Sequence, residues 1–180
     1  MERNLTHIAL FAALIAALGL IPRIDLWFGV PITAQSLGIM LCGTILGARR
    51  GALAVLLFLA LVALGLPLLS GGRGGIGVFA TPSVGYLVGF PIAAFVTGWL
   101  MERLRGDTLF AAFNAALFGG IVTLYAFGIP GIALMSGKTL AETAPAALVF
   151  LPGDLIKATL AALITQAVAR ARPGALLSRA

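Results

Sequence analysis

The chain has 180 residues, of which 61% are hydrophobic and only 10% are charged, with a net charge of +6 and a mean hydropathy of +1.10. A soluble domain of this size needs a polar surface that such a composition does not provide, so the composition excludes an ordinary soluble protein. We therefore expect an all-α integral membrane protein that forms a single membrane domain over residues 1–180.

Six apolar segments follow one another along the chain, at residues 5–21, 31–48, 51–69, 84–101, 108–135 and 143–169. Their lengths are close to the roughly 20 residues that a helix needs to cross the apolar core of a bilayer. The sequence therefore predicts six transmembrane helices. Because five further segments follow the first, we expect the first to be retained as a helix rather than removed as a signal peptide.

Basic residues predict the orientation of these helices. Eight arginines lie at the N-terminus, after the second and fourth segments, and at the C-terminus: Arg3, Arg49, Arg50, Arg103, Arg105, Arg170, Arg172 and Arg179. By the positive-inside rule, these positions and both termini are expected to be cytoplasmic. Topology and attraction to anionic membrane lipid explain the basic excess, so we expect no nucleic-acid partner.

Two connections on the predicted external side have unusual compositions. The first, at residues 22–30, carries Trp27 and Phe28, which are typical of an anchor at the membrane interface. The second, at residues 70–79, is too rich in glycine for a regular helix and too apolar for a solvated loop. Such backbone is tolerated where it packs on protein or lines a cavity, so we expect a glycine-rich lid here.

Motifs for nucleotide binding and catalysis are not supported. Residues 72–77 satisfy G-x-G-x-x-G but lack the preceding strand and soluble sheet that a dinucleotide site requires. Residues 136–139 resemble the end of a P-loop, but the earlier glycine, Gly131, is one residue too far away. With one histidine and scattered carboxylates, the sequence predicts neither an enzyme nor a metal or other cofactor.

Asp154 and Lys157 are the main candidates for a functional site, because they place opposite charges inside the last apolar segment. Residues three apart on a helix lie close together. Pro152 suits the first turn of a helix, which would place Asp154 at the positive end of the helix dipole. A buried ion pair seldom adds net stability, so we favour a ligand-binding or ion-pathway role over a structural salt bridge.

Four other residues are candidates for the same site, each with an alternative role. Arg73, in the glycine-rich loop, either sets the topology or binds an anionic part of a ligand. Gln35 either lines a cavity or bonds a neighbouring backbone. Tyr86 and Phe79 either form an aromatic wall or pack within the core.

The first apolar segment carries small residues four apart, at Ala9, Ala13 and Ala17. This spacing lets another helix approach closely. The second helix belongs either to the same chain or to a partner membrane subunit.

Three stretches of the sequence together resemble the BioY family, the biotin-specific substrate-binding components of energy-coupling-factor vitamin importers. They are Pro-Ile-Thr-Ala-Gln at residues 31–35, Gly-Gly-Arg-Gly-Gly at 71–75 followed by Pro-Ser-Val-Gly-Tyr-Leu at 82–87, and Phe-Leu-Pro-Gly-Asp-Leu-Ile-Lys at 150–157. They occur in the order and with the spacing of the family, and the similarity extends over essentially the whole chain.

The resemblance implies a six-helix bundle whose external face holds a biotin pocket, capped by the loops after the first and third helices. It implies that Asp154 and Lys157 bind the ureido group of biotin. Arg73 is the candidate for the biotin carboxylate, or it contacts the ureido end instead. Biotin is then a transported ligand rather than a cofactor.

The resemblance also implies partners and a location. Such components work with a transmembrane coupling protein and a pair of ATP-binding-cassette ATPases in the bacterial cytoplasmic membrane, and the small-residue face of the first helix docks the coupling protein. A rival hypothesis is a proton-coupled secondary transporter, in which Asp154 carries the proton and Lys157 is its counter-ion. The sequence shows no inverted repeat, which argues against this rival.

Overall fold

The computed structural model describes residues 2–24 and 30–179. Trp27 and Phe28, the predicted interfacial anchor, lie outside these described residues.

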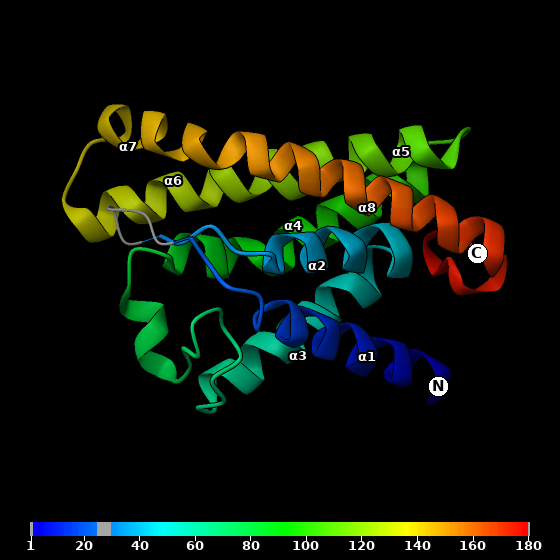
Figure 1. The fold of residues 1–180 in the computed structure, drawn as a ribbon, viewed down its shortest axis with the longest axis horizontal. Helices are drawn as coiled ribbons and strands as arrows, with labels where there is room; N and C mark the ends of the chain where they lie inside the picture. The colour runs from blue at the N-terminus through cyan, green and yellow to red at the C-terminus, as the bar shows by residue number, and fades with distance from the viewer. Residues whose placement is uncertain (1, 25–29, 180) are drawn as a thin grey trace.

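Helices make up most of the described chain (Figure 1). The α-helices are α1 (Glu2–Leu18), α2 (Gln35–Leu41), α3 (Ala48–Ala63), α4 (Val84–Arg103), α5 (Thr108–Ala115), α6 (Thr123–Ser136), α7 (Leu140–Ala147) and α8 (Leu151–Ala171). A π-helical segment, Cys42–Leu46, extends α2, and a second, Ala116–Val122, joins α5 to α6. A 3₁₀ turn, Leu148–Phe150, joins α7 to α8. Within the described residues, the eight α-helices therefore form six continuous helical segments.

Three of these helical segments are long and apolar enough to cross a membrane: Val84–Arg103, Thr108–Ser136 and Leu140–Ala171. The apolar helices Asn4–Leu18 and Gln35–Leu46 are shorter. Large apolar side chains such as Leu53, Phe95 and Leu163 are exposed on the outside of the bundle. An extended apolar exterior of this kind suits contact with lipid rather than with water.

Two helix ends differ from the sequence-based expectation. The second helix begins at Gln35 rather than at residue 31, because Ile32 forms an antiparallel bridge with Ile24. The third helix ends at Ala63 rather than at residue 69. Gly65 has a φ of 105°, which does not continue a right-handed helix and which glycine adopts readily.

The helices are arranged around α4, which packs against α2, α3, α5 and α6. Both chain ends lie at one end of the bundle, and the α3–α4 and α6–α7 connections lie at the other (Figure 1). Chain ends on the same side fit an even number of crossings. The cytoplasmic location of the termini stays a prediction.

Glycines allow the backbone of α4 to contact the backbone of neighbouring helices directly. A Cβ atom at Gly98 would collide with the backbone of Gly47 and Ala48, where α3 begins. Gly85, in the first turn of α4, faces Gly131 of α6 in the same way. Small residues at such crossings let membrane helices gain contact area that larger side chains would prevent.

We expect Gly98→Ala to lower the thermal stability of the detergent-purified protein. The added methyl group overlaps backbone atoms, which cannot move aside as a flexible side chain can, so the cost is about 1–3 kcal/mol. Gly77→Ala is the matched control, because no heavy atom lies within 4 Å of a Cβ at that position. Equal melting temperatures for the two variants would contradict close packing at Gly98.

Candidate functional site

A cavity lies among α2, α4, α6 and α8, on the side of the glycine-rich loop. It contains about 620 Å³ of space free of protein atoms, part of which is open at the mouth. The lining comes from residues 30–36, from Leu69 and Arg73, from the first turns of α4, from α6, and from the start of α8.

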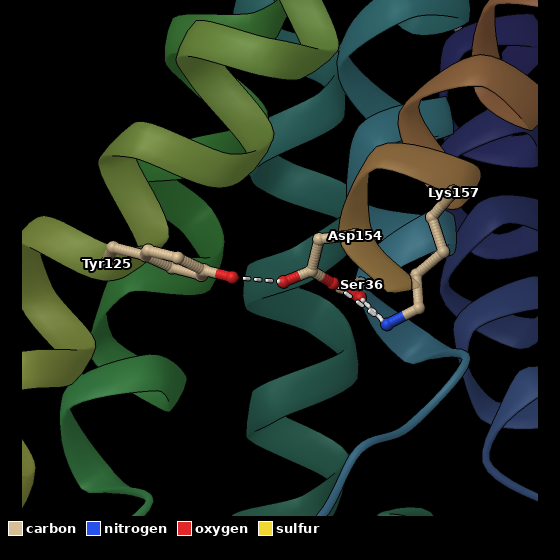
Figure 2. A network of polar contacts seen from close by, with 4 residues as sticks. All are labelled: Ser36, Tyr125, Asp154 and Lys157. Carbon is tan, nitrogen blue, oxygen red and sulfur yellow. Dashed lines mark hydrogen bonds and ion pairs between the residues drawn. The ribbon is translucent and has the colours of Figure 1, made fainter. Parts of the chain in front are cut away.

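Asp154 and Lys157 both line this cavity, and they form the predicted ion pair, with 2.9 Å between Lys157 Nζ and Asp154 Oδ1. Pro152 lies in the first turn of α8, as expected, and Asp154 is in the same turn. Two further side chains complete the network (Figure 2). Lys157 Nζ donates to Ser36 Oγ at 2.9 Å, and the Tyr125 hydroxyl donates to Asp154 Oδ2 at 2.9 Å.

The network leaves hydrogen-bonding capacity for a guest molecule. An ionised carboxylate only accepts hydrogen bonds and an ammonium group only donates them. Lys157 uses two of its three N–H groups, on Ser36 and Asp154. Asp154 receives one bond on each oxygen from protein groups, and each oxygen has a second lone pair. The site thus offers acceptors and a donor side by side.

Apolar and aromatic side chains form the rest of the cavity wall. Tyr86 and Phe150 meet edge to face, with 6.0 Å between ring centroids, and Phe90 also lines the cavity. Tyr86 therefore lines the cavity, and it also packs against the hydrophobic core, so both of the roles considered for it apply. Phe79 packs against the main core and is not among the lining residues, so the structure does not bring it to the cavity.

Gln35 lies at the edge of the cavity, and its amide is bonded to the backbone of two other segments. Its Nε2 donates to the carbonyls of Ile15 and Leu68, and its Oε1 accepts from the N–H of Ser70. The backbone-bonding alternative is therefore realised. Gln35 ties α1, α2 and the glycine-rich loop together, and only one lone pair of its oxygen stays open to a ligand.

Arg73 reaches the cavity from a turn that other residues hold in place. Leu69 and Arg73 form an antiparallel bridge, and Arg73 Nε donates to the Ser70 carbonyl at 3.4 Å. Arg23 donates to the same carbonyl at 2.9 Å. Gly71, at a φ of 80°, has no room for a Cβ because the Arg23 guanidinium lies against it. The loops after α1 and α3 are thus joined directly at the mouth.

Ala9, Ala13 and Ala17 all lie on an exposed face of α1. Ala12 and Ile15, on the adjoining face, are buried in the core. Packing within the chain therefore does not explain the three exposed alanines, and the partner-docking role stays a prediction.

Ser36 and Tyr125 are the site residues that sequence reasoning missed. Both are polar residues inside apolar segments, which is a signal that could have singled them out. Their pairing with α8 could not be read from the sequence, because Ser36 and Lys157 are 121 positions apart.

Comparison with known proteins identifies the family. A profile of the BioY family matches residues 2–174. The chain belongs to the BioY family. The resemblance found in the sequence motifs is thereby confirmed.

Individual members of the family are similar over nearly their whole length. The biotin transporter BioY of Rhodobacter capsulatus is 53% identical and covers 99% of this chain and 100% of that protein. The biotin transporter BioY of Rhizobium etli is 55% identical, with 92% of each chain covered. The crystal structure of the S-component for biotin from an ECF-type ABC transporter superposes with a TM-score of 0.89 at 34% identity, covering 94% of this chain and 92% of that one.

These relatives are transporters rather than enzymes, which agrees with the expectation that this chain is not an enzyme. The shared fold and the long apolar helices make the chain a multi-pass membrane protein.

We expect Gln35→Ala to destabilise the protein by about 3 kcal/mol. The variant removes the hydrogen bonds of Gln35 to the Ser70 N–H and the Leu68 carbonyl, whereas the Ile15 carbonyl keeps its bond from the Gly19 N–H. Backbone groups left without a partner cost roughly 1–3 kcal/mol each. The measurement is the melting temperature in detergent. Gln166→Ala, at a half-buried glutamine of α8, removes the same side chain away from the cavity and is the control. A similar melting temperature for both variants would contradict the structural role of Gln35.

Proposed function

We propose that this chain is the biotin-binding component of a vitamin importer, which captures biotin on the external side of the membrane and delivers it inward. The observation that carries the proposal is the Asp154–Lys157 pair, which lines a cavity and has hydrogen-bonding capacity left for a ligand. Membership of the BioY family and the biotin-transporting relatives support it.

The ureido group of biotin matches the open capacity of the pair. A cyclic urea has two N–H donors beside one carbonyl acceptor. Asp154 accepts from the N–H groups, and the third N–H of Lys157 donates to the carbonyl. Charge-assisted hydrogen bonds of this kind are stronger than neutral ones, and more so in a cavity that excludes water.

The rest of biotin matches the remaining wall. Its fused rings and valeryl chain are apolar and pack against Tyr86, Phe90 and Phe150. Arg73, which also lines the cavity, is the candidate cation for the carboxylate at the end of that chain. In this arrangement the glycine-rich loop is the external lid, and its bonds to Arg23 and Gln35 hold it over the ligand.

Energy for inward delivery comes from partner subunits in this proposal, since the sequence carries no ATP-binding motif. The S-component with the same fold belongs to an ECF-type ABC transporter, which supports such partners here. The exposed face of Ala9, Ala13 and Ala17 docks the transmembrane coupling protein, and ATP-binding-cassette ATPases bind on the cytoplasmic side. The complex resides in the bacterial cytoplasmic membrane, with both termini of this chain inside.

The proposal predicts saturable binding of biotin to the purified protein, measured by isothermal titration calorimetry in detergent. The reason is that the cavity and its polar groups belong to this chain alone, so binding does not need the partner subunits. A folded sample that shows no saturable heat of binding would rule out the proposed function.

We further expect Asp154→Asn and Lys157→Ala each to weaken biotin binding by at least about 30-fold. Truncating one member of a buried charge pair costs roughly 2–5 kcal/mol, because it also strands the other member. Lys138→Ala, an exposed cation in the α6–α7 connection, is the control and should bind like the wild type. Wild-type affinity in both site variants would place the biotin site elsewhere.

A further inference from the structure

The Tyr86 hydroxyl is buried and has no hydrogen-bond partner within residues 2–24 and 30–179. Tyr86 lines the same cavity as Asp154 and Lys157. A buried tyrosine hydroxyl normally finds a partner, because leaving it unbonded costs free energy. An unbonded hydroxyl beside a cavity therefore indicates a partner that enters the cavity.

The position of the Tyr86 ring is built into the packing of α4 against α6. A Cβ at Gly128 would collide with the hydroxyl end of the ring, so glycine is the residue that leaves this space. Gly85 and Gly131 bring the two helices together next to it, and Phe150 contacts the ring from the start of α8. The Tyr86 ring is thus held between Gly128 and Phe150.

Tyr125 provides the contrast within the same cavity. Its hydroxyl comes from α6 and donates to Asp154 Oδ2 at 2.9 Å (Figure 2). Of these two tyrosine hydroxyls, one supports the carboxylate and the other has no hydrogen-bond partner in the part of the chain that the structure describes.

A count of the hydrogen-bond donors around a bound cyclic urea indicates a role for the Tyr86 hydroxyl. The ureido carbonyl accepts two hydrogen bonds, and Lys157 has only one N–H left to give. We propose that Tyr86 donates the second hydrogen bond to the ureido carbonyl, and that it thereby selects ligands that carry a cyclic urea. This inference rests on the proposed function and adds a donor to it.

The test is Tyr86→Phe, which keeps the ring and removes only the hydroxyl. Two ligands are titrated by calorimetry: biotin, and the alcohol analogue in which the tail carboxylate is replaced by CH₂OH. Affinity should fall by about tenfold for both ligands, the effect of losing one hydrogen bond of about 1.4 kcal/mol. The melting temperature without ligand should stay the same or rise, because the variant removes an unbonded buried group.

The tail-modified ligand separates the two polar ends of biotin. A loss for biotin alone would show that Tyr86 bonds the tail carboxylate and would overturn the assignment. Unchanged affinity for both ligands, or a lower melting temperature without ligand, would also overturn it. If the wild-type protein binds neither ligand, the proposed function itself fails. If the wild type binds both ligands and Tyr86→Phe binds them with the same affinity, only the assignment of Tyr86 fails.

A ligand-side measurement adds a second readout. In the analogue with C=S in place of the ureido C=O, the sulfur is a weak acceptor, so the wild type should prefer biotin over it. Tyr86→Phe should reduce this preference, and an unchanged preference would contradict the contact. Tyr125→Phe is the matched control, because it removes a hydrogen bond already made in the empty protein and should lower the melting temperature without ligand.

Discussion

The burial of Asp154 and Lys157 within an apolar bundle is the constraint on which the rest of the site depends. Taking two charges out of water is costly, and the pair is tolerated only when further hydrogen bonds satisfy both groups. Ser36 and Tyr125 supply those bonds. Since the four residues come from three different helices, α2, α6 and α8 must meet at one level, and the cavity forms where they meet.

Close packing around α4 makes this meeting possible. Its glycine contacts, at Gly98 with the start of α3 and at Gly85 with α6, fix the helices at backbone distance. A few hydrogen bonds hold the mouth of the cavity instead: the Ser70 N–H donates to Gln35 Oε1, and Arg23 donates to the Ser70 carbonyl. A loop held by a few hydrogen bonds undergoes local unfolding more readily than closely packed helices do. The structure therefore combines closely packed helices around the site with a mouth that a few hydrogen bonds hold together.

Local signals in the sequence predict a large part of this arrangement. Apolar segment lengths give the helices, and the three-residue spacing of Asp154 and Lys157 gives the pair. Contacts between distant segments could not be predicted from the sequence. Examples are the hydrogen bond from Lys157 to Ser36 and the hydrogen bonds between the Gln35 amide and three backbone groups. The start of the second helix differs from the prediction for a related reason, whereas the third helix ends early because Gly65 takes a positive φ. Ile32 is apolar enough for a helix, but its pairing with Ile24 decides its conformation.

If the cavity binds a ligand as proposed, its polar groups act on selectivity as well as on affinity. An apolar cavity of the same shape would accept any apolar ring system and would distinguish ligands that differ by one methylene only weakly. A cavity whose donors and acceptors are incompletely bonded rejects a ligand that cannot complete them, because those groups then stay buried without partners. In the proposed function, the open capacity of Asp154 and Lys157 and the Tyr86 hydroxyl, which has no partner among the described residues, lower the stability of the empty site and make it discriminate between ligands of similar size.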